Sequence, residues 1–255
     1  YKNDGLQNQY VVYRQKEGGD PEVFFDPNTF SEDGTTSLAG LNFTDDGSLA
    51  AYAISEGGSD WRKIIVIDTE TMEQVGDTIR DVKFSGISWK GKEGFFYSSY
   101  DKPEGSELSA KTQYHKMYFH ELGTPQSSDE LVFGGEATPR RYIFGGVSED
   151  GNWLVISASV STSGNELYIK DLRRANSPIV PVVTNFDNNH SVIHVEGESI
   201  YIQTDLDAPN SRLVKVDAAN PTPDNWEDVI AEREEPLSAG TGGGYFFARY
   251  LKDAL

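Results

Sequence analysis

Short hydrophobic runs that alternate with polar residues recur along this chain, and polar, Gly-rich loops separate them. Residues 55–68, SEGGSDWRKIIVID, are the clearest example, because a polar loop there leads into an apolar stretch that ends at Asp68. Residues 164–171 and 210–217 repeat the same pattern. Alternation of this kind predicts β-strands with at least one buried face.

A second apolar run precedes each of these stretches, and a glycine lies just before it. These glycines are Gly47, Gly94, Gly151, Gly197 and Gly244. Their spacings are 47, 57, 46 and 47 residues, so the chain repeats in units of about fifty residues. A repeat of this length with several short strands is typical of propeller blades. The sequence therefore predicts an all-β fold, a β-propeller with four-stranded antiparallel blades, of which about five are present.

The fourth repeat illustrates the predicted blade. Its strands are expected at residues 142–148, 153–161, 166–172 and 179–183. Helical periodicity is confined to residues 226–235, which also fit a fourth strand, and to the last few residues. No linker interrupts the pattern, so residues 1–255 are predicted to form one domain. The terminal run at 245–250 is expected to pair with the runs near the N-terminus and to complete a composite blade.

Composition narrows the function classes. The chain has 41 acidic and 22 basic residues and a net charge of −19, which argues against binding to nucleic acid or to an anionic membrane. It has no Cys, which excludes disulfides, thiolate metal sites and a Cys nucleophile. No stretch approaches the apolar length that crosses a bilayer. We expect a cytoplasmic protein, with the periplasm as the alternative.

Several strings together resemble one family. They are YKNDGLQNQ (1–9), VFFDPN (23–28), SEDGTTSL (31–38), GSDW (58–61), VKFSGISW (82–89), QYHKMYFHELGT (113–124) and APNSRL (208–213). In this order they resemble the N-terminal β-propeller of the prolyl oligopeptidase family, and the likeness covers essentially the whole chain. It implies an excerpt of a seven-bladed propeller that caps a serine peptidase domain. The implied partners are short proline-containing peptides and the peptidase domain of the same parent chain.

The residues themselves show no catalytic centre. No G-x-S-x-G nucleophile elbow occurs, and no His lies in a sequence context like that of a catalytic loop. We therefore expect no catalytic residue, cofactor or metal in this chain. His115 and His120 differ by an odd number and face opposite sides of a strand, whereas His190 and His194 are spaced to share a face. The second pair leaves a metal site open, although two surface histidines on a strand are favoured.

The resemblance assigns roles to a few positions. Phe84 matches a residue that lines an apolar substrate subsite, and the alternative is an aromatic of the blade core. Tyr142, with Ile143 as the neighbouring choice, falls where the family has another subsite residue. Asp60 matches an acidic residue that forms a salt bridge to the peptidase domain, and the alternative is a turn residue. The loop 157–165 corresponds to one that reaches substrate, but it lacks the Arg expected there.

Three functions from different classes follow. The first is substrate gating, in which the propeller admits short peptides to a peptidase domain. The second is a non-catalytic propeller that binds a protein or peptide partner. The third is a five-bladed glycosidase, which needs converging carboxylates. Asp45, Asp101 and Asp150 are its candidates, yet these lie mostly in Asp-Gly turns that explain them locally.

Overall fold

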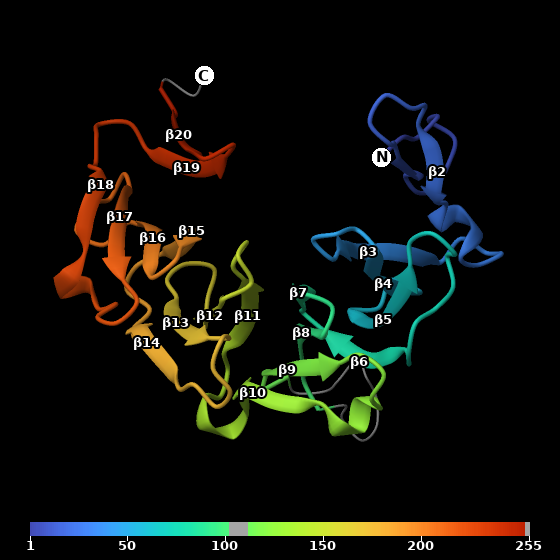
Figure 1. Ribbon diagram of the computed structural model, residues 1–255, viewed down its shortest axis with the longest axis horizontal. Coiled ribbons are helices and arrows are strands. Elements are labelled where there is room, and N and C mark those ends of the chain that lie inside the picture. The colour runs from blue at the N-terminus through green and yellow to red at the C-terminus, as the bar shows by residue number, and fades with distance from the viewer. Residues whose placement is uncertain (102–111, 253–255) are drawn as a thin grey trace. The chain divides into compact units, whose positions relative to one another are not determined.

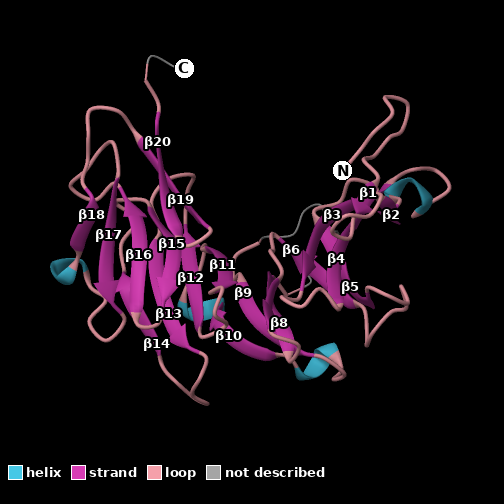
Figure 2. Cartoon of the chain, turned by 45° about the horizontal axis from the view of Figure 1, so that its top comes forward, coloured by secondary structure: helices cyan, strands magenta, loops and turns pink. Residues whose placement is uncertain are grey.

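The computed structural model describes residues 1–101 and 112–252, and its regular structure is almost entirely β-strand (Figure 2). Its helical segments are the single 3₁₀ turns η1 (Pro27–Thr29), η2 (Gln126–Ser128), η3 (Gly135–Ala137) and η4 (Pro223–Asn225). Of the two readings of residues 226–235, the strand is confirmed and the helix is wrong, because β18 (Glu227–Ile230) pairs with its neighbour. The last three residues, also considered helical, lie outside the described part. No helix within that part is long and apolar enough to cross a membrane.

The chain divides into two compact units. Unit 1 contains Tyr1–Lys111 and Tyr118–Val132, and unit 2 contains Thr112–Met117 and Phe133–Leu255. The organisation of residues 1–255 as one domain stays a prediction.

The first half of the chain forms a hairpin and two four-stranded sheets. The hairpin consists of β1 (Val12–Arg14) and β2 (Glu22–Phe25), and the next sheet of β3 (Thr36–Phe43), β4 (Leu49–Glu56), β5 (Trp61–Asp68) and β6 (Ile79–Lys83). The following sheet consists of β7 (Ser88–Lys90), β8 (Gly94–Ser99), β9 (Lys116–Glu121) and β10 (Glu130–Gly134). In both four-stranded sheets, hydrogen-bonded neighbours are consecutive in the chain.

Residues 142–250 of unit 2 also form two four-stranded sheets and a hairpin, with the hairpin last. Its first sheet consists of β11 (Tyr142–Val147), β12 (Trp153–Ser159), β13 (Glu166–Asp171) and β14 (Ile179–Val183). Its second consists of β15 (His190–Glu196), β16 (Ser199–Thr204), β17 (Arg212–Asp217) and β18, and a hairpin of β19 (Leu237–Gly242) and β20 (Tyr245–Tyr250) follows. Figure 1 shows the strands of each sheet side by side in chain order. All strand pairs in this unit are antiparallel, so the predicted four-stranded antiparallel sheets are confirmed.

The two end hairpins β1–β2 and β19–β20 are each a sheet of their own. The composite blade expected from the two ends of the chain stays a prediction.

Neighbouring sheets pack face to face within each unit. In unit 2, Leu167 and Ile169 of β13 share one buried cluster with Ile200 and Ile202 of β16. The opposite face of β16 carries Tyr201, which packs with side chains of the hairpin β19–β20. Fully burying one aliphatic side chain contributes about 1.5–3 kcal/mol. The sheet β15–β18 is therefore stabilised by packing on both of its faces. Burial on both faces explains why its strands read as nearly continuous hydrophobic runs.

Four of the five repeated glycines lie in tight turns between the first and second strands of a sheet, whereas Gly94 is the first residue of β8. Between β3 and β4, Gly47 has a φ of 68° and its N–H donates to the carbonyl oxygen of Thr44 at 2.8 Å. The carboxylate of Asp46 accepts hydrogen bonds from within the same turn. Between β11 and β12, Gly151 has a φ of 73° and Asp150 accepts in the same way. Glycine adopts this left-handed conformation without a steric penalty, which explains the repeat at the level of the backbone.

A buried polar network in unit 1 joins β8, β9 and the residue before β10. His120 Nδ1 lies 2.8 Å from Asp129 Oδ1, and the Tyr97 hydroxyl donates to Asp129 Oδ2 at 2.7 Å. The side chains of His120 and Asp129 are only 2% and 3% exposed. A carboxylate removed from water to this extent is tolerated because both of its oxygens are hydrogen-bonded.

Replacing Asp129 with Asn should lower the free energy of unfolding by about 2–3 kcal/mol, because an amide cannot accept from both partners. Urea denaturation followed by circular dichroism measures this difference. Asp187→Asn is the matched control, since Asp187 is exposed, and it should change stability by less than about 0.5 kcal/mol. An equally small effect of Asp129→Asn would show that the network contributes nothing.

Tyr97 should make stability sensitive to alkaline pH. Burial raises the pKa of Tyr97 above its ordinary 10.0, and the hydrogen bond to the Asp129 carboxylate raises it further. The folded pKa exceeds the unfolded one, so this stabilisation is fully present below pH 10 and is lost as the pH rises beyond it. The expected slope is up to about 1.4 kcal/mol per pH unit from this group. In Tyr97→Phe the unfolding free energy should fall less steeply above pH 10, and equal slopes would contradict the assignment.

Candidate functional site

Phe84 lies in the connection between β6 and β7 rather than within a strand. Its φ is 52°, a conformation that residues other than glycine rarely adopt. The half-buried ring stands edge-on to Tyr100, with 6.4 Å between centroids, and the ammonium group of Lys83 lies 5.2 Å from its centre. The string VKFSGISW is thus divided between two sheets by a turn at Phe84. A held left-handed residue costs free energy, which marks this turn as a candidate functional position.

Asp60 lies directly before β5, and its carboxylate is 3.8 Å from the ammonium group of Lys83. The Asp60 side chain is 64% exposed, whereas that of Lys83 is 11% exposed. Lys83 also lies 5.1 Å from the ring centre of Trp61. Asp60 therefore has one partner inside unit 1 and presents the rest of its carboxylate to solvent. Its predicted contact with a peptidase domain stays a prediction.

Tyr142 and Ile143 open strand β11 and point to opposite faces of it. Tyr142 is 40% exposed and Ile143 is 0% exposed, while Phe144 is 45% exposed. The Ile143 N–H donates to Nδ1 of buried His115 at 2.8 Å, and the His115 ring is within 6.5 Å of both aromatic rings. Tyr142, rather than Ile143, is thus the residue of the predicted pair that can meet a ligand. Phe144 was missed, although the two-residue period of a strand places it beside Tyr142.

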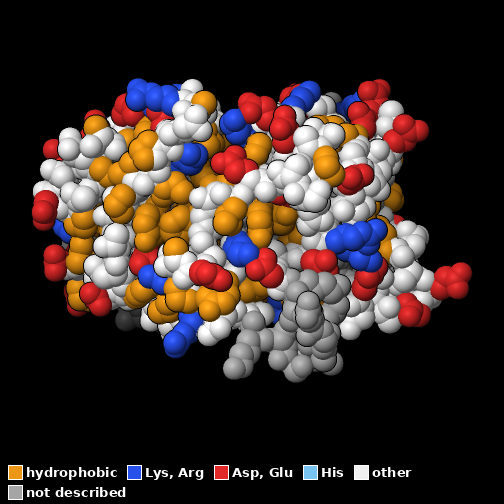
Figure 3. All heavy atoms as spheres, turned by 90° about the horizontal axis from the view of Figure 1, so that it is seen from below, with side chains coloured by type: hydrophobic (Ala, Val, Ile, Leu, Met, Phe, Trp, Pro, Cys, Tyr) orange, Lys and Arg blue, Asp and Glu red, His pale blue; other side chains and the backbone are white. Residues whose placement is uncertain are grey.

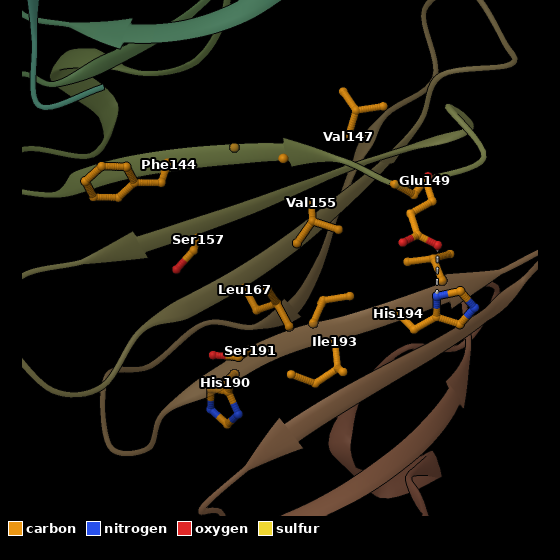
Figure 4. A pocket seen from close by; sticks show the side chains of 15 residues that line it. Phe144, Val147, Glu149, Val155, Ser157, Leu167, His190, Ser191, Ile193 and His194 are labelled. Atoms are coloured by element: carbon orange, nitrogen blue, oxygen red, sulfur yellow. Dashed lines mark ion pairs between the residues drawn. The ribbon is translucent and has the colours of Figure 1, made fainter. Parts of the chain in front are cut away.

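An open cavity of about 400 Å³ lies beside β11 in unit 2 (Figure 4). Its walls come from residues 144–149, from strands β12 and β13, and from β15. Apolar groups line most of it, including Phe144, Val155 and Leu167. Figure 4 shows polar groups toward its ends, where His194 Nδ1 is 3.8 Å from a Glu149 carboxylate oxygen. An apolar hollow with a few polar groups is the usual character of a ligand site. We refer to this cavity as the β11 groove.

Two adjacent glycines shape the β11 groove differently. A Cβ atom on Gly145 would lie 2.5 Å from Cε of Met117 and 2.9 Å from its sulfur, so the absence of a side chain allows close packing. A Cβ atom on Gly146 would meet nothing within 4 Å. Gly146 therefore lines open space, and its missing side chain keeps the groove wide.

Asn165, at the end of the loop after β12, links β12 to β15 beside the groove. Its amide nitrogen donates to Ser157 Oγ at 3.1 Å and to the carbonyl oxygen of His190 at 3.0 Å. Its side-chain oxygen accepts from the His190 N–H at 2.8 Å. Ser157 itself belongs to β12, so the predicted loop begins later than expected. This anchoring fixes β12 and β15 on either side of the groove.

The prediction that His190 and His194 share a face is wrong. The register of β15 shifts between Val192 and His194, where a bulge turns the following side chains to the other face. His190 is buried, and its Nδ1 is 2.9 Å from the hydroxyl oxygen of Thr204. Burial lowers the pKa of His190, against an opposing effect of Asp205. Within residues 1–101 and 112–252, no three His, Asp or Glu side chains are placed to hold a metal ion.

The family model for the prolyl oligopeptidase N-terminal β-propeller domain matches residues 1–255. The chain belongs to this family. The β-propeller expected from the repeat is thereby confirmed, and the glycosidase alternative is left without support.

Relatives of this propeller chain are considerably longer than it is. It is 57% identical over 256 residues to a prolyl endopeptidase of Elizabethkingia miricola, covering 100% of this chain and 36% of the relative. It is 59% identical over 255 residues to a prolyl endopeptidase of Elizabethkingia meningoseptica, with the same coverage. The chain thus spans about 36% of the length of these curated relatives.

Solved prolyl peptidases share the fold of this propeller chain. A structure from a study of inter-domain dynamics in two prolyl endopeptidases has a TM-score of 0.88 at 30% identity, covering 99% of this chain and 36% of that one. Prolyl oligopeptidase B from Galerina marginata, bound to a 35mer hydrolysis and macrocyclization substrate, has a TM-score of 0.86 at 29% identity. That likeness covers 98% of this chain and 38% of the other.

Alanine substitutions at Gly145 and Gly146 should affect stability differently, because only Gly145 is closely packed. Gly145→Ala should cost about 1–3 kcal/mol of unfolding free energy, because the added methyl group displaces the end of Met117. Gly146→Ala should change stability by less than about 0.5 kcal/mol. Thermal and urea denaturation of both variants measure this contrast. A larger loss for Gly146→Ala than for Gly145→Ala would contradict the contacts described for these two glycines.

Proposed function

We propose that this chain is the substrate-gating propeller of a prolyl oligopeptidase, a serine endopeptidase that cleaves short peptides after proline. The observation that carries the proposal is the exposed aromatic pair Tyr142 and Phe144 beside the β11 groove. It occurs in a chain of a family whose curated relatives are prolyl endopeptidases. In this proposal the Ser, His and Asp of catalysis come from a peptidase domain of the parent protein.

The chemistry of the β11 groove suits a proline-containing peptide. Proline lacks a backbone N–H and presents a rigid apolar ring, so burying it leaves fewer polar groups unpaired than burying another residue. Aromatic rings offer large contact areas to such a ring. The ends of the groove, with Ser157, Ser191 and the Glu149–His194 pair, can meet the amide groups of the flanking residues. The groove would hold the peptide in position and contribute binding energy remote from the reacting bond.

Phe84 and Asp60 are further parts of this proposal. The turn at Phe84 presents a half-buried aromatic ring that would contribute an apolar subsite. The exposed carboxylate of Asp60 would pair with a cation of the peptidase domain, and its weak contact with Lys83 at 3.8 Å leaves capacity for it. We also propose a cytoplasmic location for the parent protein, with the periplasm as the alternative, which fractionation of cells would decide.

Peptide binding should depend on the aromatic pair of β11. Tyr142→Ala and Phe144→Ala should each weaken binding of a Gly-Pro chromogenic peptide to the purified chain by about 3–10-fold, as loss of an aromatic contact predicts. Isothermal titration measures the affinity, and release of the chromophore should not be detected.

The matched control is Tyr245→Ala, which removes an exposed tyrosine of β20 in the same unit. It should leave the affinity within twofold of the original. Wild-type affinity in both β11 variants would exclude this surface as the peptide site. Hydrolysis that survives further purification would exclude a purely gating role.

A further inference from the structure

A second, polar cavity lies in unit 1 and is formed by other strands than the β11 groove. Its volume is about 300 Å³, and it lies between the end of β4, the start of β5 and β6. The side chains that matter for its chemistry are Trp61, Arg62, Arg80 and Asp81. A wall with two guanidinium groups and an indole is rich in hydrogen-bond donors. We refer to this cavity as the β5 cavity.

Trp61 differs from the other tryptophans of the chain in its hydrogen bonding. The indole N–H groups of Trp89, Trp153 and Trp226 donate to backbone carbonyl oxygens at 3.1, 2.8 and 2.9 Å. The chain has four tryptophans, and the indole N–H of Trp61 is shielded from solvent with no acceptor among the described residues. A shielded donor without a partner costs about 1–3 kcal/mol. Trp61 thus lines this cavity and carries a buried indole donor without an acceptor among the described residues.

Arg62 also has a buried donor without an acceptor among the described residues, and its side chain is charged. This donor is the N–H group at Nε. Neither Arg62 nor Arg80 forms an ion pair with another described residue, although acidic residues outnumber basic ones by 41 to 22. Lys63, by contrast, forms an ion pair with Glu56, with 2.7 Å between Nζ and Oε2.

We propose that the β5 cavity binds a carboxylate group. Guanidinium groups present several N–H donors in a fork that matches the two oxygens of a carboxylate. The indole N–H supplies a further, neutral donor. Two acidic side chains, those of Glu56 and Asp81, line the cavity. Three basic side chains, those of Arg62, Lys63 and Arg80, line it as well, so positive charges outnumber negative ones. The carboxylate comes either from a free small acid or from the C-terminus of a peptide, and the two share the recognised group. This inference does not depend on peptide binding at the β11 groove.

Nuclear magnetic resonance of the ¹⁵N-labelled chain tests the proposal, because each tryptophan gives one indole signal. Trp61→Phe identifies the Trp61 signal. Sodium acetate and sodium succinate are titrated at constant ionic strength, with sodium chloride as the reference salt. The Trp61 signal should move downfield with either carboxylate and not with chloride. The other three signals should stay in place, because their N–H groups are already bonded, and they report that the fold is intact.

Arg62→Gln and Arg80→Gln should each weaken acetate binding at least tenfold, since each removes a charged donor. Arg174→Gln is the matched control, because it removes the same charge from an exposed site in unit 2. Arg80 is exposed, so its variant decides the question if Arg62→Gln perturbs the other indole signals. An unmoved Trp61 signal, or wild-type affinity in Arg80→Gln, would overturn the proposal.

Peptides distinguish the two sources of the carboxylate. A short peptide with a free C-terminus is compared with its C-terminal amide and with succinate. Tighter binding of the free peptide than of succinate identifies a peptide terminus, and the reverse order identifies a free acid. Equal shifts with the amide and the free peptide would overturn carboxylate recognition altogether.

Discussion

The structure depends on sheets that are buried on both faces. In β16, Ile200 and Ile202 pack against the sheet before it, and Tyr201 packs against the hairpin after it. Adjacent residues of one strand therefore serve two different cores. A register slip of one residue would exchange the two sets and place each in the wrong core. This requirement fixes the pairing of each strand. Candidate binding sites are therefore expected at edges, turns and bulges, where the pairing is interrupted.

The β11 groove is one such interruption. The bulge in β15 moves His194 to the face opposite His190 and so brings it within reach of Glu149. On the other wall, Gly145 lets β11 approach Met117 while Gly146 leaves space unfilled. A groove here is thus a consequence of small departures from regular strand geometry. Because these departures are held by packed sheets, the cavity is formed before any ligand arrives, which reduces the entropic cost of binding.

The local hydrophobic pattern predicted the strands well. The features that it did not predict depend on contacts between residues far apart in the sequence or on interruptions of the strand register. The alternation within residues 142–148 and 166–172 is visible in the sequence, and strands β11 and β13 begin where it begins. The left-handed turn at Phe84 was not visible, because VKFSGISW has the composition of one strand. The bulge in β15 was missed for the same reason, since periodicity assumes an unbroken register. The resemblance pointed to Tyr142 and Ile143 together, and burial separated them. The lack of a described acceptor for the Trp61 indole N–H has no sequence signal at all, because it depends on where acceptors lie in space.

Charge distinguishes the two candidate sites. Asp and Glu side chains are spread over the face shown in Figure 3, with Lys and Arg among them and hydrophobic side chains between. A net charge of −19 repels anions at long range, but salt screens this repulsion beyond about 8–10 Å. The electrostatic field of the protein contributes little to the binding of a neutral ligand in an apolar groove. A proline flanked by neutral residues therefore suits the β11 groove. The β5 cavity instead needs local donors strong enough to overcome the repulsion. Arg62 and Arg80 meet that need, because neither forms an ion pair within residues 1–101 and 112–252. Pairing them with the abundant carboxylates of the chain would have cancelled their charge and left no site for an acid.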